Sequence, residues 1–145
     1  MSYVSNALCV SAFREAGLAV VARYFGLAVI EIEIRDDASG KTDTVGSTED
    51  LPLIDRIAIQ FAGQASTTVF KCRSQTLAST DAAEISKLVE GLAEGHSLEV
   101  RNAGYRRAIE IVRSNAAEVE RLANLLIEQR RVSESTIAQT TILVS

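Results

Sequence analysis

Few side chains in this sequence are of the types that do chemistry, and they do not form familiar sets. The chain has one histidine, His96, and two cysteines, Cys9 and Cys72, which stand far apart. Closely spaced cysteines or histidines, the pattern of a zinc knuckle, are missing, as is a Ser-His or Cys-His set that would suggest a nucleophile with its base. The remaining candidates are two adjacent charges, Arg14 and Glu15, because a glutamate with an activating partner can act as a general base.

The segment around these charges, from Ala12 to Arg23, reads Ala-Phe-Arg-Glu-Ala-Gly-Leu-Ala-Val-Val-Ala-Arg. It resembles the zinc helix of the FtsH-type ATP-dependent metalloproteases and of small proteins related to their peptidase domain, which reads His-Glu-Ala-Gly-His-Ala-Val-Val-Ala. Three later stretches resemble that domain in the same order, so the resemblance extends over about residues 8 to 137. They are residues 59–70, where Gly63 falls in the family's Leu-Ala-Gly-Arg-Ala-Ala-Glu segment but Ser66 and Thr67 replace Ala-Glu, then residues 80–85, and finally residues 109–126.

The resemblance implies a zinc site whose ligands have been lost. In the family, two imidazoles four residues apart hold zinc on one helix face, and the glutamate between them is the general base. The corresponding positions here are Arg14, Glu15 and Leu18, and the third ligand position is Asp81. Arg14 and Leu18 have no lone pair to offer a metal. Because a catalytic zinc ion needs three protein ligands, we expect no zinc and no other cofactor.

We therefore expect a non-catalytic metalloprotease-like domain, a pseudopeptidase, that acts as a binding or scaffolding module for an unknown protein partner or for a second copy of itself. One alternative is a metalloendopeptidase-type hydrolase that uses an unrecognised metal site or Glu15. Another is a small-molecule binder at the vacated metal pocket. In that pocket Arg14 and Asp81 either pair in place of the zinc or stay separately solvated. Glu84, one helical turn beyond Asp81, and Gly63 are further candidate pocket residues.

Hydrophobic periodicity predicts the elements that must position these residues. The first half of the chain is expected to contain a helix, a hairpin and a second helix. The expected bounds are a helix over 5–25, capped by Ser5 or Asn6 and ended by Gly26, a strand over 28–35 with its isoleucines on one face, a turn over 36–41, a short strand over 42–46, and a helix over 52–70.

The second half of the chain is predicted to be almost entirely helical. A loop over 71–79 precedes a helix over 81–94 that Gly95 ends, with His96 in the loop that follows. A helical tail over 98–131 is expected to break at Asn115, which forms a capping-box-like pair with Glu118. A last short helix is expected to start within residues 133–137, and the β-branched stretch 140–144 is compatible with a terminal strand. The predicted class is α+β, mainly α, with a small hairpin packed on the helices, and the resemblance adds a zincin-like peptidase fold.

The composition indicates one compact domain over residues 1–145. The chain is 47% hydrophobic and 23% charged, and its net charge is −4 with a pI of about 5.1. It offers no basic footprint for nucleic acid. The most apolar stretch, residues 16–34, contains Arg23, Glu31 and Glu33, so it does not predict a membrane span. Without a signal-peptide pattern, a Walker-type loop or a membrane segment, we expect a cytoplasmic protein with no ATPase domain.

The loss of both imidazoles predicts the metal content of the purified protein. Elemental analysis after incubation with zinc and mild chelation should find less than about a tenth of an equivalent, because one carboxylate cannot retain the ion. A content near one equivalent that is lost in Asp81→Ala would contradict this expectation and restore the protease interpretation.

Overall fold

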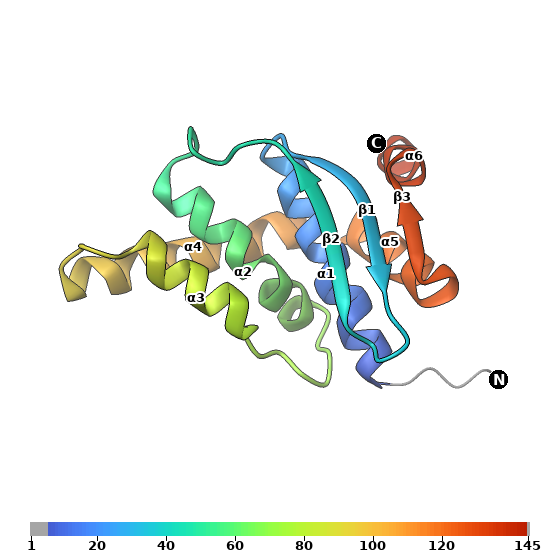
Figure 1. Ribbon diagram of the computed structural model, residues 1–145, viewed down its shortest axis with the longest axis horizontal. Helices are drawn as coiled ribbons and strands as arrows, with labels where there is room; N and C mark the ends of the chain where they lie inside the picture. The colour runs from blue at the N-terminus through green and yellow to red at the C-terminus, as the bar shows by residue number, and fades with distance from the viewer. Residues whose placement is uncertain (1–5, 145) are drawn as a thin grey trace.

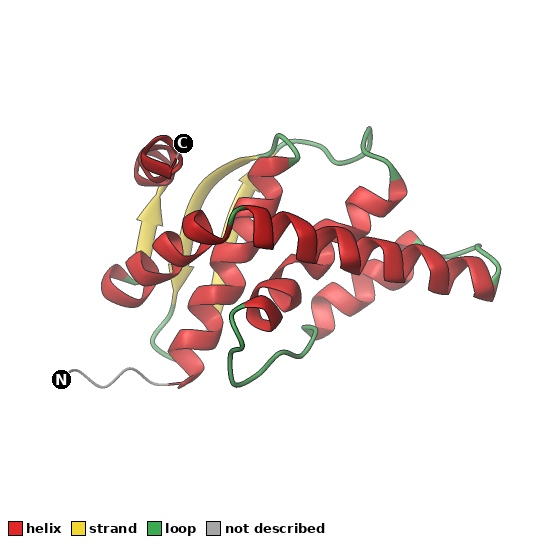
Figure 2. Cartoon of the chain, turned by 180° about the vertical axis from the view of Figure 1, so that it is seen from behind, coloured by secondary structure: helices red, strands yellow, loops and turns green. Residues whose placement is uncertain are grey.

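The computed structural model describes residues 6–144, with side chains over residues 6–139. It is mainly helical with a small antiparallel sheet, which confirms the α+β, mainly α class. Figure 1 shows α1 lying behind the sheet, and Figure 2 shows the same arrangement from the other side. The elements are α1 (Asn6–Tyr24), β1 (Ala28–Ile34), β2 (Gly40–Val45), α2 (Leu53–Val69), α3 (Ser79–Leu88), α4 (Glu94–Ser114), α5 (Ala116–Gln129), β3 (Arg131–Ser133) and α6 (Glu134–Val144).

The helix α1 is the centre of the molecule. It packs against α2, α4 and α5 and against the strands β1 and β2. Its alanines Ala12, Ala16 and Ala19 are fully buried, and so is Val21. A helix that is apolar around most of its circumference is a core helix rather than a surface helix. The helix expected over residues 5–25 is therefore confirmed to within one residue at each described end, as a buried helix.

The sheet has β1 in the middle, with β2 and β3 antiparallel on its two sides. Ile32 is the central buried residue and pairs with Thr42 on β2 and with Val132 on β3. The register against β2 shifts between Val29 and Glu31. Because an extra residue reverses the facing of a strand, Val29 is buried and Ile30 is 40% exposed. The expected alternation, with Ile30 on the buried face, is therefore wrong at this end of the strand.

Close packing of α1 on α2 depends on two glycines. A Cβ atom on Gly17 would stand 2.2 Å from the Cβ atom of Ser66, and one on Gly63 would stand 2.7 Å from Cγ of Arg14. The buried hydroxyl of Ser66 donates a 2.6 Å hydrogen bond to the carbonyl oxygen of Phe13. Residues with small side chains thus let the backbones of the two helices approach each other.

Two predicted boundaries between α2 and α4 are wrong. The helix α3 ends at Leu88 instead of residue 94, because the chain turns there and Gly91 adopts a left-handed φ of +88°. Gly95 does not end a helix but lies in the first turn of α4, and His96 lies in that turn rather than in a loop. The expected loop before α3 is confirmed, although α3 begins at Ser79.

The C-terminal prediction is partly right. The break at Asn115 is confirmed, but Asn115 makes no capping hydrogen bond and instead donates from Nδ2 to the carbonyl oxygen of Ile111 at 2.8 Å. Arg130, with a φ of +65°, ends α5 and directs the chain into β3, a strand that the sequence did not predict. A last helix does start within residues 133–137, as expected, but α6 continues from Glu134 to Val144, so the strand expected over 140–144 is wrong. The expected cap Ser5 lies outside the described residues.

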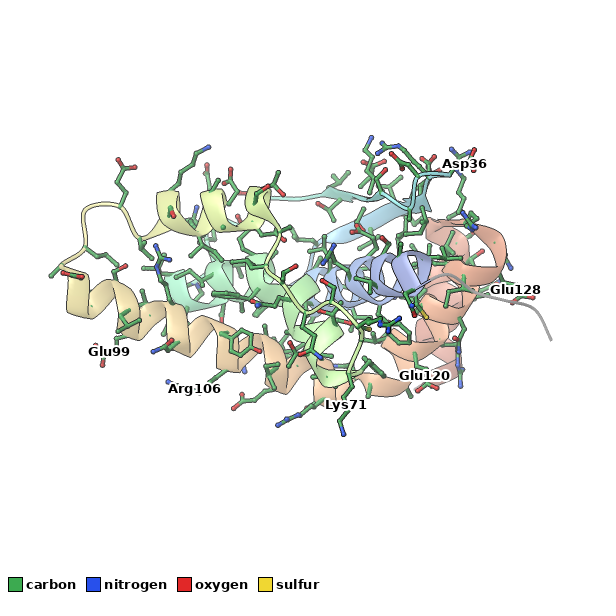
Figure 3. The ribbon with its side chains drawn as sticks, turned by 90° about the horizontal axis from the view of Figure 1, so that it is seen from below. Asp36, Lys71, Glu99, Arg106, Glu120 and Glu128 are labelled. Carbon is green, nitrogen blue, oxygen red and sulfur yellow. The ribbon has the colours of Figure 1, made fainter. Side chains whose placement is uncertain are left out.

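The outer surface carries acidic and basic side chains side by side. Glu99 and Arg106 project from α4, and Glu120 projects from α5 (Figure 3). None of the helices in the described part of the chain is both long and apolar enough to cross a membrane.

Replacing Gly17 with alanine should destabilise the protein although it favours the helix. The gain in helix propensity is about 1 kcal/mol, and overpacking against Ser66 should cost about 1–3 kcal/mol. Gly95→Ala is the matched control, since a Cβ atom there meets nothing within 4 Å. We expect urea denaturation to show a lower free energy of unfolding for Gly17→Ala and an unchanged or higher one for Gly95→Ala. Equal effects of the two changes would contradict the close approach of α1 and α2.

Candidate functional site

A cavity of about 370 Å³ lies between α1, the hairpin, α2 and the start of α3. It brings together five of the residues singled out in the sequence, namely Arg14, Glu15, Leu18, Gly63 and Asp81. Glu84 is not among its lining residues: it is exposed, and its carboxylate pairs with Nζ of Lys87 at 3.3 Å. The rest of the wall consists of Ser11, residues 38–42, Ile59, Ala78 and Thr80.

The helix α1 supplies one wall, because residues that are three or four positions apart on a helix share a face. Ser11, Arg14, Glu15 and Leu18 have this spacing and all line the cavity. The opposite wall is held in place by the hydroxyl of Ser11, which donates a hydrogen bond to the carbonyl oxygen of Ala38 in the turn of the hairpin. This contact ties the hairpin turn to the helix that carries the candidate residues.

A glycine in the hairpin leaves room for the carboxyl group of Glu15. A Cβ atom on Gly40 would stand 2.5 Å from Cγ and 2.9 Å from Oε2 of Glu15. Next to Gly40 on β2, the hydroxyl of Thr42 donates a 2.7 Å hydrogen bond to Oε1 of Glu15. The hairpin therefore covers the carboxyl group and also satisfies one of its oxygens.

Glu15 is a buried acid whose protonated form the fold favours. Only 8% of the residue is exposed. Burial raises the pKa of its carboxyl group, and the nearby charge of Asp81 raises it further, while the Thr42 hydrogen bond and the charge of Arg14 oppose the shift. Since burial is the largest of these effects, the pKa of Glu15 lies above its ordinary value of 4.5. Ionisable groups whose pKa values are shifted by burial and by neighbouring charges are common at functional sites.

Asp81 lies in the first turn of α3 and is half-buried. Burial raises the pKa of its carboxyl group, and the positive charge of Arg14 acts in the opposite direction. The helix N-terminus is a favourable place for its negative charge. Asp81 thus places a carboxyl group at the N-terminus of α3, where it lines the same cavity as the residues of α1.

Arg14 lines the same cavity as these acids without forming an ion pair with either of them. Among the described residues it forms no ion pair, and its buried Nε atom has no hydrogen-bond partner. Its charge nevertheless affects the pKa values of both Glu15 and Asp81. Of the two alternatives for Arg14 and Asp81, the structure shows neither a direct ion pair nor two unrelated surface charges. Instead, they share one cavity at a separation beyond a salt bridge.

The donors in this cavity do not fit a zinc ion. Glu15 and Asp81 offer carboxylate oxygens, while Arg14 and Leu18 offer no lone pair, and zinc sites prefer nitrogen and sulfur donors in sets of three or four. His96 is remote in sequence and lies on α4, where Nδ1 is 3.7 Å from the carboxylate of Glu99. Over residues 6–144, no group of three His, Cys, Asp or Glu side chains is arranged to hold a metal ion.

Sequence reasoning missed the residues of the cavity that lie on the hairpin. Thr42 was expected only as part of a strand and Gly40 only as part of a turn, yet both contact Glu15. The available signal was weak: a glycine in a turn and a threonine in a strand are ordinary. Only the packing of β2 against α1 gives these residues a role at the site.

No protein-family model matches this chain, and no curated protein is similar enough to match it. The resemblance to FtsH-type peptidases is therefore a hypothesis that depends on the motifs and on their arrangement.

The raised pKa of Glu15 predicts a pH-dependent effect of Glu15→Gln. The folded protein binds the proton of Glu15 more tightly than the unfolded chain does, so this contribution to stability is present below pH 4.5 and is lost as the pH rises through the folded pKa. Glutamine stays neutral and can still accept the Thr42 hydrogen bond. The free energy of unfolding of the Glu15→Gln variant, relative to that of the original protein, should therefore increase as the pH rises above 4.5.

Denaturation curves between about pH 4 and about pH 8 test this expectation. Glu84→Gln removes the same charge from an exposed position and controls for net charge. The increase in the free energy of unfolding caused by Glu15→Gln, compared with the change caused by Glu84→Gln, should be larger at neutral pH than at acidic pH. A gain that does not depend on pH would contradict the burial of an ionisable carboxyl group.

Proposed function

We propose that this chain is a non-catalytic relative of the FtsH-type peptidase domain whose former metal pocket binds a small zwitterionic ligand, of the amino-acid or short-peptide type. The observation that carries the proposal is the shared cavity of Arg14, Glu15, Leu18, Gly63 and Asp81. These residues come from three helices, and the resemblance relates all of them to one site. Their meeting in one cavity supports a common origin for that site.

The charges of the cavity support a zwitterionic ligand. Arg14 has a buried donor without a partner, and a guanidinium group is well suited to a carboxylate. Asp81 and Glu15 offer acceptors to an ammonium group on the same ligand. The volume of about 370 Å³ falls at the lower end of the range for small-molecule pockets. An amino acid or short peptide carries both charges within that size.

One observation favours a second candidate function, a hydrolase that depends on Glu15. The hydroxyl of Thr42 lies 2.7 Å from the carboxylate of Glu15, which is the distance expected between a hydroxyl nucleophile and its base. The raised pKa of Glu15 also suits a group that accepts a proton. Binding without turnover and Glu15-dependent turnover are therefore the two outcomes to separate.

Calorimetric titration with the free amino acids and with short unblocked peptides tests the proposal. We expect saturable binding by at least one of these probes, and we expect Asp81→Asn to weaken that binding by about tenfold because it removes a charged hydrogen-bond acceptor. Glu84→Gln is the matched control, since it removes a carboxylate one turn further along α3, outside the cavity. The control should bind as the original protein does.

Turnover assays with fluorogenic peptides and a simple ester separate the candidates. No hydrolysis above the rate of Glu15→Gln supports the binding module. Hydrolysis that is lost in both Glu15→Gln and Thr42→Val would replace it with the hydrolase. Failure of every zwitterionic probe to bind would overturn the proposed ligand class.

A further inference from the structure

Arg14 also lines a second cavity, of about 470 Å³, beside the start of α1. Its opposite wall is the loop between α2 and α3, represented by Arg73, Ser74 and Thr76. None of the lining residues belongs to the acidic part of the first cavity, because Glu15 and Asp81 line only the first one. The second cavity is therefore a distinct site that adjoins the first and shares Ser11 and Arg14 with it.

The second cavity is basic in a protein that is acidic overall. The chain has a net charge of −4, but the described residues around this cavity include two arginines and no carboxylate. The Nε atom of Arg14 is buried and has no hydrogen-bond partner. The first turn of α1 also contains no acidic residue that would offset the positive end of the helix dipole. Arg14 is half-buried and forms no ion pair among the described residues, so its guanidinium group is available to an anionic ligand at this cavity.

The hydroxyl groups of the loop add donors to the two guanidinium groups. Oγ of Ser74 and Oγ1 of Thr76 lie 3.3 Å apart, and only one of them can donate to the other. The second hydroxyl proton remains available to a ligand. The loop is held by two side-chain amides: Gln75 donates to the carbonyl oxygen of Cys72, and Gln64 on α2 donates to that of Gln75. These contacts fix the hydroxyl groups relative to α2.

We infer that the second cavity binds a phosphoryl group, either free phosphate or the phosphate of a small organic molecule. Two guanidinium groups and a free hydroxyl supply donors for an oxyanion with several acceptors, and arginine is the usual residue for this task. Ala7 and Val10 add an apolar wall, which gives an organic portion of the ligand a surface to contact. The site does not depend on the proposed function of the first cavity.

Nuclear magnetic resonance titration of the full chain with inorganic phosphate and with glycerol 3-phosphate, at constant ionic strength set with chloride, tests the inference. We expect saturable shifts of the amide signals of residues 7–10 and 73–76. Arg73→Gln should weaken binding by about tenfold, because it removes a charge-assisted hydrogen bond. Lys71→Gln is the matched control: it removes a positive charge from the same loop, but Lys71 does not line the cavity and points away from the molecule (Figure 3).

The outcomes separate the sources of the ligand and the two sites. If glycerol 3-phosphate binds more tightly than inorganic phosphate, the natural ligand is an organic phosphate. If the two probes bind equally, the site takes the free oxyanion. Both results support the site. Asp81→Asn should leave phosphate binding in place while it weakens the zwitterionic probes. The inference is overturned if phosphate gives no saturable shifts, or if Lys71→Gln weakens binding as much as Arg73→Gln, which would show only a general effect of charge.

Discussion

The close approach of α1 and α2 is the constraint on which the rest of the structure depends. It requires Gly17 opposite Ser66 and Gly63 opposite Arg14, since a Cβ atom on either glycine would collide with its neighbour. The approach allows the hydroxyl of Ser66 to reach the backbone of Phe13, and it lays the Arg14 side chain over α2. The helix α1, held in this way, supplies Ser11 and Arg14, which line both cavities.

Burial of Glu15 is the second feature that needs a physical reason. Placing a carboxyl group in a nearly enclosed site is unfavourable. Among the described residues, the hydrogen bond from Thr42 and the nearby charge of Arg14 offset this cost in part. The packing of Gly40 on the same carboxyl group shows that the hairpin is shaped to cover it. A core made only for stability would place an apolar side chain here. The buried acid is the reason for giving Glu15 a place in the proposed binding cavity.

Arg14 links the two cavities. Its aliphatic part contacts Gly63 on α2, its charge influences the acids of the first cavity, and it lines the second cavity together with Arg73. In the resemblance to FtsH-type peptidases this is a lost metal-ligand position. The guanidinium group of Arg14 is suited to anionic groups, and both proposals use it: for a carboxylate in one cavity and for a phosphoryl group in the other. Ligands in the two cavities would compete for one guanidinium group.

The sequence by itself determined the class of the fold and most of its elements. Periodic apolar residues placed α1, α2 and the long helices after residue 94, because burial of one face requires that spacing. The resemblance also singled out five of the residues that line the first cavity, although Glu84, singled out with them, lies outside it. Local sequence patterns did not predict the elements that depend on tertiary contacts. The strand β3 forms by pairing with the edge of β1. Residues 140–144 are helical despite their β-branched side chains. The exposure of Ile30 depends on a register shift. The contacts of Thr42 and Gly40 with Glu15, and the second cavity, arise from segments far apart in the chain, which no local pattern of residues encodes.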